Sequence, residues 1–125
     1  MQKIQSFTDL IAWKEGHKLV LDIYKITSSF PQRESYVLTD QMRRCVISIT
    51  TNIAEGFSRK TNKEKAQFYY ISLGSTTELQ NQLLIAKDLR YLEKSAFDEL
   101  ANSTIYIHKL LFGLIKSSKK LIPYT

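Results

Sequence analysis

The sequence contains very few residues that end helices or form turns. Its 125 residues include only four glycines and two prolines, so tight turns have few places to form. An apolar content of 43% excludes a low-complexity or disordered chain. We therefore expect an all-α fold in a single domain spanning residues 1–125, because a chain of this length can bury a core without disulfides or metal ions.

Cysteine and long apolar runs are also scarce. The one cysteine, Cys45, cannot form an internal disulfide, which fits a reducing compartment. We interpret it as a small core residue rather than a nucleophile. No stretch approaches the roughly 18 apolar residues of a membrane span, and the first ten residues lack the apolar run of a signal peptide. These absences predict a cytoplasmic protein with no membrane partner.

The motifs of common catalytic and metal sites are missing. The two histidines, His17 and His108, do not belong to the Glu-x-x-His pairs of di-iron bundles. The sequence has no glycine-rich phosphate loop, no GxSxG elbow and no HExxH motif. We predict that the protein is not an enzyme and has no catalytic residue, cofactor or metal. A hydrolase using Glu55 or Glu78 is a distant alternative.

What the sequence does contain is four amphipathic segments, which predict helices over about residues 9–29, 39–58, 62–91 and 95–119. Thr39 or Asp40 can cap the second helix, Thr61 the third and Ser95 the fourth. Gly74 would let another helix approach the third one closely. The short connections favour an antiparallel up-down-up-down four-helix bundle, with a long self-assembling α-hairpin as the structural alternative.

The second helix carries a polar lane directly beside its apolar face. A similar lane on the third helix includes Ser75 and Glu78, and we expect the two lanes to face each other and fix the register of a structural interface. In this arrangement Arg44 or Arg59 would pair with Glu55 or Glu78. The predicted interface residues are Gln41, Arg44, Ser48, Asn52, Glu55, Ser75 and Glu78.

The third helix has two apolar faces where a simple bundle needs one. One face carries Ala66, Tyr70, Leu73, Thr77 and Leu84, and the nearly opposite face carries Phe68, Ile71, Leu79, Ala86 and Leu89. Together with seven tyrosines and six phenylalanines, this surplus predicts a homo-oligomer in which helices of neighbouring protomers pack. The number of subunits cannot be read from the pattern.

The formal net charge of +6 would attract a polyanion such as nucleic acid. The strongest cluster lies between the second and third helices and contains Arg59, Lys60, Lys63 and Lys65, and Arg43 is a second candidate. A solvated lysine-rich loop is the alternative interpretation of this cluster. The lysines at the end of the fourth helix complement the helix dipole and receive less weight.

Four segments carry a resemblance to a known family: DLIAWKEGHKL at 9–19, Phe30-Pro31 with Glu34 and Tyr36, QMRRCVISITTNIAEGFSR at 41–59, and GSTTELQNQL at 74–83. Over residues 7–115 the chain resembles the four-helix-bundle proteins encoded in intervening sequences of bacterial 23S ribosomal RNA genes. The resemblance implies small bundles that form rings, often pentamers. Val37 stands where a small residue, commonly glycine, often follows the tyrosine.

This family is similar to the accessory protein of diversity-generating retroelements, which binds nucleic acid and a reverse transcriptase. We therefore predict a non-enzymatic oligomer that binds RNA or DNA through charge and shape rather than base sequence. The alternative is a scaffold or accessory subunit that docks a protein partner, for example a reverse transcriptase, without binding nucleic acid itself.

Overall fold

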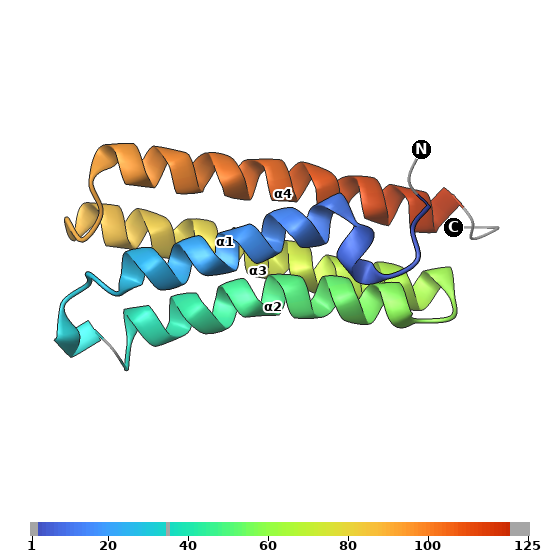
Figure 1. Ribbon diagram of the computed structural model, residues 1–125, viewed down its shortest axis with the longest axis horizontal. Coiled ribbons are helices and arrows are strands. Elements are labelled where there is room, and N and C mark those ends of the chain that lie inside the picture. The colour runs from blue at the N-terminus through green and yellow to red at the C-terminus, as the bar shows by residue number, and fades with distance from the viewer. Residues whose placement is uncertain (1–2, 35, 121–125) are drawn as a thin grey trace.

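The computed structural model describes residues 3–34 and 36–120, and within this part of the chain it contains four long helices and no strand. The helices are α1 (Ile11–Thr27), α2 (Leu38–Ser58), α3 (Asn62–Asp88) and α4 (Lys94–Lys120). Two short 3-10 turns, η1 (Phe7–Asp9) and η2 (Gln32–Glu34), precede α1 and α2. The predicted all-α fold with four helices is confirmed (Figure 1).

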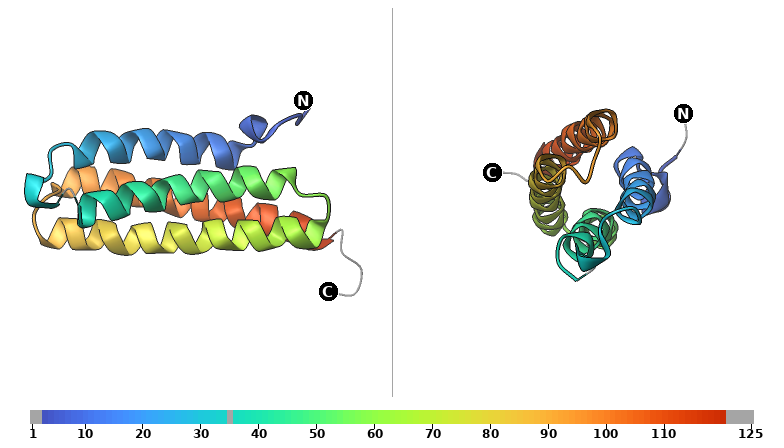
Figure 2. Two further views of the ribbon diagram at one scale, coloured as in Figure 1. Left: turned by 90° about the horizontal axis from the view of Figure 1, so that it is seen from below. Right: turned by 90° about the vertical axis from the view of Figure 1, so that its left-hand side faces the viewer.

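The four helices lie side by side around one apolar core (Figure 2). Helices α1 and α3 each pack against both α2 and α4. Every helix contributes large side chains that are fully buried, because the apolar positions of each recur at three- and four-residue steps. These side chains are Leu19 and Ile23 of α1, Met42, Ile49 and Ile53 of α2, Leu79 and Leu83 of α3, and Ile107 and Leu111 of α4.

The predicted helix caps are correct at one position and wrong at two. The Thr61 hydroxyl accepts a hydrogen bond from the Glu64 N–H at 3.2 Å and caps α3. Helix α2 begins one residue before Thr39, so Val37 is its N-cap and makes no side-chain cap bond. Helix α4 begins at Lys94, which places Ser95 inside the helix.

Close helix contact occurs at glycines other than the predicted one. Apart from the adjoining backbone of α3, nothing lies within 4 Å of the position that a Cβ would take at Gly74, so no other helix of the bundle approaches there as expected. At Gly56 the Cβ position lies 2.6 Å from Cε1 of Tyr69, and at Gly16 it lies 2.9 Å from Cγ2 of Thr50. Gly56 therefore brings α3 close to α2 just before their connection, and Gly16 brings α1 close to α2.

The bundle uses only part of the apolar surplus of α3. Ala66, Leu79 and Ala86 are buried in the bundle, whereas other apolar residues of the same helix remain exposed. The exposed ones are Tyr70, Ile71, Leu84 and Ile85, and Leu89, which directly follows the helix, is exposed as well. None of the described helices is long and apolar enough to cross a membrane.

Candidate nucleic-acid interface

The polar lanes of α2 and α3 lie side by side. The Ser48 and Ser75 hydroxyl oxygens are 2.8 Å apart and share a hydrogen bond. The Asn52 amide nitrogen donates to the Ser48 carbonyl at 2.8 Å and to the Ser48 hydroxyl at 3.1 Å. The structure thus brings together Ser48, Asn52 and Ser75 in a half-buried network between the two helices.

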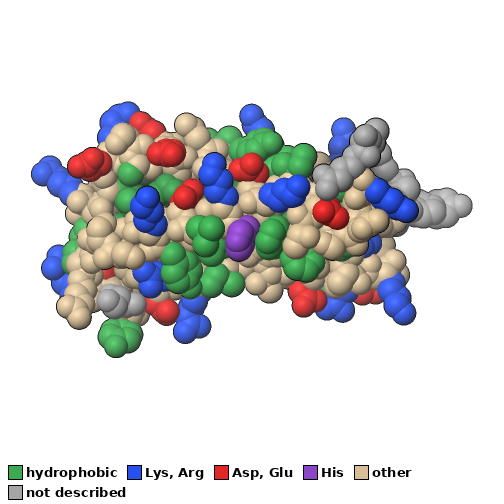
Figure 3. Space-filling model, viewed as in Figure 1, with side chains coloured by type: hydrophobic (Ala, Val, Ile, Leu, Met, Phe, Trp, Pro, Cys, Tyr) green, Lys and Arg blue, Asp and Glu red, His purple; other side chains and the backbone are tan. Residues whose placement is uncertain are grey.

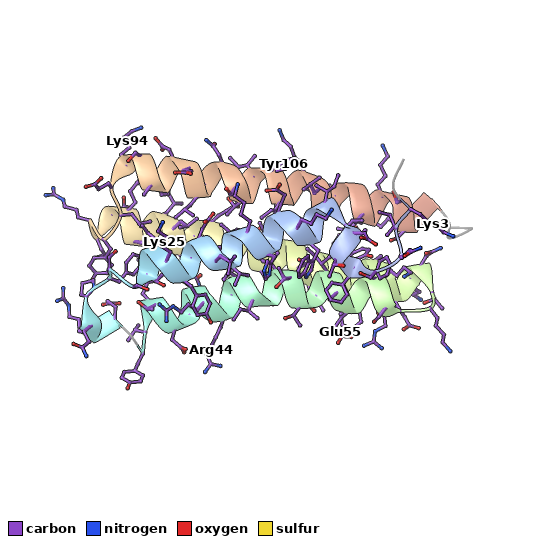
Figure 4. The ribbon with its side chains drawn as sticks, viewed as in Figure 1. Lys3, Lys25, Arg44, Glu55, Lys94 and Tyr106 are labelled. Atoms are coloured by element: carbon purple, nitrogen blue, oxygen red, sulfur yellow. The ribbon has the colours of Figure 1, made fainter. Side chains whose placement is uncertain are left out.

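Arg44 and Arg59 pair with carboxylates four residues earlier in the sequence. Arg59 contacts Glu55 at 3.1 Å, one of the pairs expected, but Arg44 contacts Asp40 at 2.9 Å instead of Glu55 or Glu78. Both pairs are four residues apart on one helix, where side chains of opposite charge meet without help from a second helix. Arg44 and Glu55 point outward from α2 (Figure 4).

A shallow groove of about 350 Å³ follows the same α2–α3 junction. It is lined by Gln41, Arg44, Cys45, Ser48, Ser75 and Glu78. At its base the Cys45 thiol donates to the Ser75 carbonyl at 3.0 Å. Burial, together with the nearby Glu78 carboxylate, raises the pKa of the Cys45 thiol to about 12. A thiol held protonated in this way is a poor nucleophile, which agrees with its interpretation as a core residue.

The four cations around the α2–α3 connection differ in how far they are already engaged. The Arg59 guanidinium lies 4.5 Å from the centre of the Phe68 ring, in addition to its ion pair. The Lys65 ammonium donates to the Phe57 carbonyl at 2.6 Å. Lys60 and Lys63 are exposed, and within the described residues they form neither an ion pair nor a hydrogen bond. Their ammonium groups are therefore the ones open to a phosphate.

Arg43 is held in place by α1 and does not join this cluster. Its Nε donates to the Thr27 hydroxyl at 3.0 Å and its Nη2 to the Tyr24 carbonyl at 3.3 Å. The guanidinium also lies 4.6 Å from the centre of the Tyr24 ring. These contacts involve the last turn of α1, at the end of the bundle opposite to the α2–α3 connection (Figure 1). The geometry makes Arg43 an anchor between α1 and α2.

The positive charge is concentrated in one half of the bundle. Figure 1 shows that the start of α1, the α2–α3 connection and the end of α4 lie at the same end. We call the half that contains this end, residues 3–19, 48–74 and 108–119, the basic half. It carries ten Lys and Arg against four Asp and Glu, a formal charge of +6. The other half, residues 20–47 and 75–107, carries seven Lys and Arg against eight Asp and Glu, a formal charge of −1.

The lysines at the end of α4, which received less weight in the sequence, lie beside α3. The Lys119 ammonium lies 5.0 Å from the centre of the Tyr70 ring, so the end of α4 adjoins the first turns of α3. Lys116 is exposed on the same end of α4. Lys116 and Lys119 follow the exposed Phe112 by four and seven residues. This helical spacing in the sequence indicates that the three side chains share one edge of α4.

The described residues contain no group of three or more His, Cys, Asp or Glu side chains that could hold a metal ion.

Comparison with known proteins identifies the family of this chain. A family model described as 23S rRNA-intervening sequence protein matches residues 8–113. A crystal structure of a protein with unknown function from the S23 ribosomal protein family, from Bacteroides thetaiotaomicron VPI-5482, superposes with a TM-score of 0.78 at 20% identity. The match covers 85% of this chain and 96% of that one, and at this identity it shows the fold alone. A search of curated proteins finds no significant match. The chain belongs to the 23S rRNA-intervening sequence protein family.

Proposed function

We propose that this protein is a non-enzymatic, cytoplasmic, up-down-up-down helical bundle that assembles as a homo-oligomer and binds RNA or DNA through its basic half. The concentration of charge carries the proposal, since a formal charge of +6 in one half of the bundle attracts a polyanion to that half. The first contacts are assigned to Lys60 and Lys63, supported by Arg59 and Lys65. Arg43 is assigned a structural role because α1 already holds its guanidinium.

Two separate sets of exposed apolar side chains support self-association. Leu21 and Tyr24 of α1 and Ile47 of α2 are 59%, 39% and 40% exposed, and Figure 3 shows hydrophobic side chains gathered along the face that α1 and α2 form. Ile71 of α3 and Leu89, which directly follows α3, are also exposed. A contact between two different patches of identical subunits is the kind that closes into rings, as expected from the pentamers of the family resemblance.

In a ring of this kind all subunits point the same way along the ring axis. Every basic half then lies on the same side of the ring, and the phosphate contacts of several subunits act together on one strand. Weak contacts by two lysines per subunit thereby produce useful affinity without recognition of base sequence.

The test is binding of fluorescently labelled RNA and DNA over a salt series. Lys60→Gln combined with Lys63→Gln should weaken binding and make the slope of log K against log salt shallower by roughly one for each phosphate that the variant no longer binds. Lys25→Gln combined with Arg33→Gln is the matched control, since it removes the same charge outside the basic half. Equal weakening in the two double variants would contradict the proposal, as would binding that does not respond to salt.

A protein-docking scaffold is the second candidate function, and the end of the bundle opposite to the α2–α3 connection favours it. Tyr36 is 93% exposed there and Val37 is 56% exposed, in the connection between α1 and α2. The purified protein would decide between the two functions. Protein docking would be favoured if the protein carried no nucleic acid, with a 260 to 280 nm absorbance ratio typical of pure protein, and co-purified with a defined partner.

A further inference from the structure

The outer edges of α3 and α4 form a regular exposed seam. Exposed side chains recur every seven residues on α3, at Tyr70, Thr77 and Leu84, and on α4, at Ile105, Phe112 and Lys119. The Lys119 ammonium lies over the Tyr70 ring, and Leu84 and Ile105 line one shallow apolar groove, so the two series lie along each other. We call these six residues the α3–α4 seam.

The chemistry of the seam changes along its length. Its far part, at Leu84 and Ile105, is aliphatic, whereas its part in the basic half is aromatic and cationic. Tyr70 and Phe112 are 44% and 52% exposed, so a large part of each ring faces solvent. The Phe112 ring is held edge-on by His108, with ring centres 4.9 Å apart.

Three lysines lie on the same two helices as these rings. Lys119 lies 5.0 Å from the centre of the Tyr70 ring, and Lys116 follows Phe112 by one helical turn. Lys63 is exposed on α3, seven residues before Tyr70. Seven residues of α-helix rise by about 10 Å, so the rings and lysines are spaced along a distance of a few nucleotides.

Exposed rings flanked by lysines match a single-stranded nucleic acid better than a duplex. A duplex hides the faces of its bases in the stack and presents phosphates outward, so it gains nothing from an exposed ring. A single strand offers its base faces, which stack on aromatic side chains while cations follow the backbone. We propose that the preferred ligand is single-stranded RNA or DNA, with bases stacked on Tyr70 and Phe112 and phosphates bound by Lys63 and Lys116. This inference rests on the proposed function.

The test compares a labelled 20-nucleotide single strand of uridine or thymidine with a 20-base-pair duplex. Wild-type protein should bind the single strand more tightly. Tyr70→Ala and Phe112→Ala should each weaken binding of the single strand by about five-fold to a hundred-fold, the range for removing one stacked base, while duplex affinity changes little. The matched control is Tyr106→Ala, which removes an equally exposed ring, 46% exposed, from α4 outside the seam (Figure 4).

The outcomes separate this inference from the function on which it rests. Equal affinity for both forms, or unchanged single-strand binding by Tyr70→Ala and Phe112→Ala, overturns the stacking assignment while the lysine variants still test the basic half. Sedimentation of each variant is run alongside, and a decrease in affinity that accompanies dissociation of the assembly also overturns the assignment. Binding of neither form by the wild type defeats both proposals.

Discussion

Replacing Gly56 by alanine should destabilise the protein, although alanine is the better helix former. The added Cβ would lie 2.6 Å from Cε1 and 2.9 Å from Cδ1 of Tyr69, and 3.2 Å from the Lys65 carbonyl oxygen. Tyr69 is 3% exposed, so its ring has little room to retreat, and a backbone carbonyl of α3 cannot rotate away. Helices α2 and α3 must therefore move apart next to the connection that carries Lys60.

The magnitude follows from two opposing contributions. Forcing extra volume into a packed contact costs about 1–3 kcal/mol. Replacing glycine by alanine inside a helix regains up to about 1 kcal/mol. The expected net destabilisation is about 1–2 kcal/mol, which for a domain of this size lowers Tm by roughly 3–10 °C. Thermal unfolding followed by circular dichroism at one fixed protein concentration measures it, since the Tm of an oligomer depends on concentration.

Gly74→Ala and Gly113→Ala are the matched controls. Both glycines lie inside long helices, and apart from the adjoining backbone of the same helix nothing lies within 4 Å of their Cβ positions. Each substitution should therefore raise stability by about 0.5–1 kcal/mol through helix propensity and the smaller entropy of the unfolded chain. If Gly56→Ala stabilised the protein as the controls do, the close approach of α2 and α3 at Tyr69 would be refuted.

Three further predictions concern single groups. Thr61→Ala removes the acceptor for the Glu64 N–H and should cost about 1 kcal/mol in chemical denaturation, and an unchanged midpoint would count against the cap. The Cys45 thiol, with its pKa raised to about 12, should not react with a disulfide reagent at pH 8 until urea unfolds the protein. Two backbone N–H groups donate to Asp9 and lower its pKa. Its contribution to local order should therefore be complete above the ordinary value of 3.8 and be lost as the pH falls through the lowered pKa. Amide NMR signals of η1 that do not change on acidification would contradict this.

Sequence periodicity predicted the features that depend on one helix at a time, namely where the helices lie and which residues share a face. The ends of α2 and α3 lie within a few residues of the expected ones, and the polar lane of α2 meets Ser75 through Ser48. A lane is visible in the sequence because its members recur at three- and four-residue steps, whatever the neighbouring helix does. The expectation that α2 and α3 pack side by side then predicted that their lanes would meet.

Features that depend on the register between helices could not be predicted in this way. The close contacts at Gly16 and Gly56 require knowing which turn of one helix faces which turn of the next, and a single helical pattern does not contain this. Arg44 was expected to reach across the interface, yet Asp40 lies four residues away on its own helix and competes more easily. Arg43 lies beside Arg44 in the sequence but reaches Tyr24 on α1 instead.

Several cations of this chain already contact groups of the protein itself, and this bears on the nucleic-acid site that we propose. Within the described residues, five Lys or Arg side chains lie over aromatic rings. A cation on an intramolecular ring can still attract a phosphate at long range, but forming a direct contact requires it to leave or share its partner. In the function we propose, long-range attraction and direct contact therefore fall to different residues: the whole basic half would attract the polyanion, and exposed lysines such as Lys60 and Lys63 would bind it. Removing those two should speed dissociation by deleting direct contacts, and it should also slow association, because the formal charge of the basic half falls from +6 to +4.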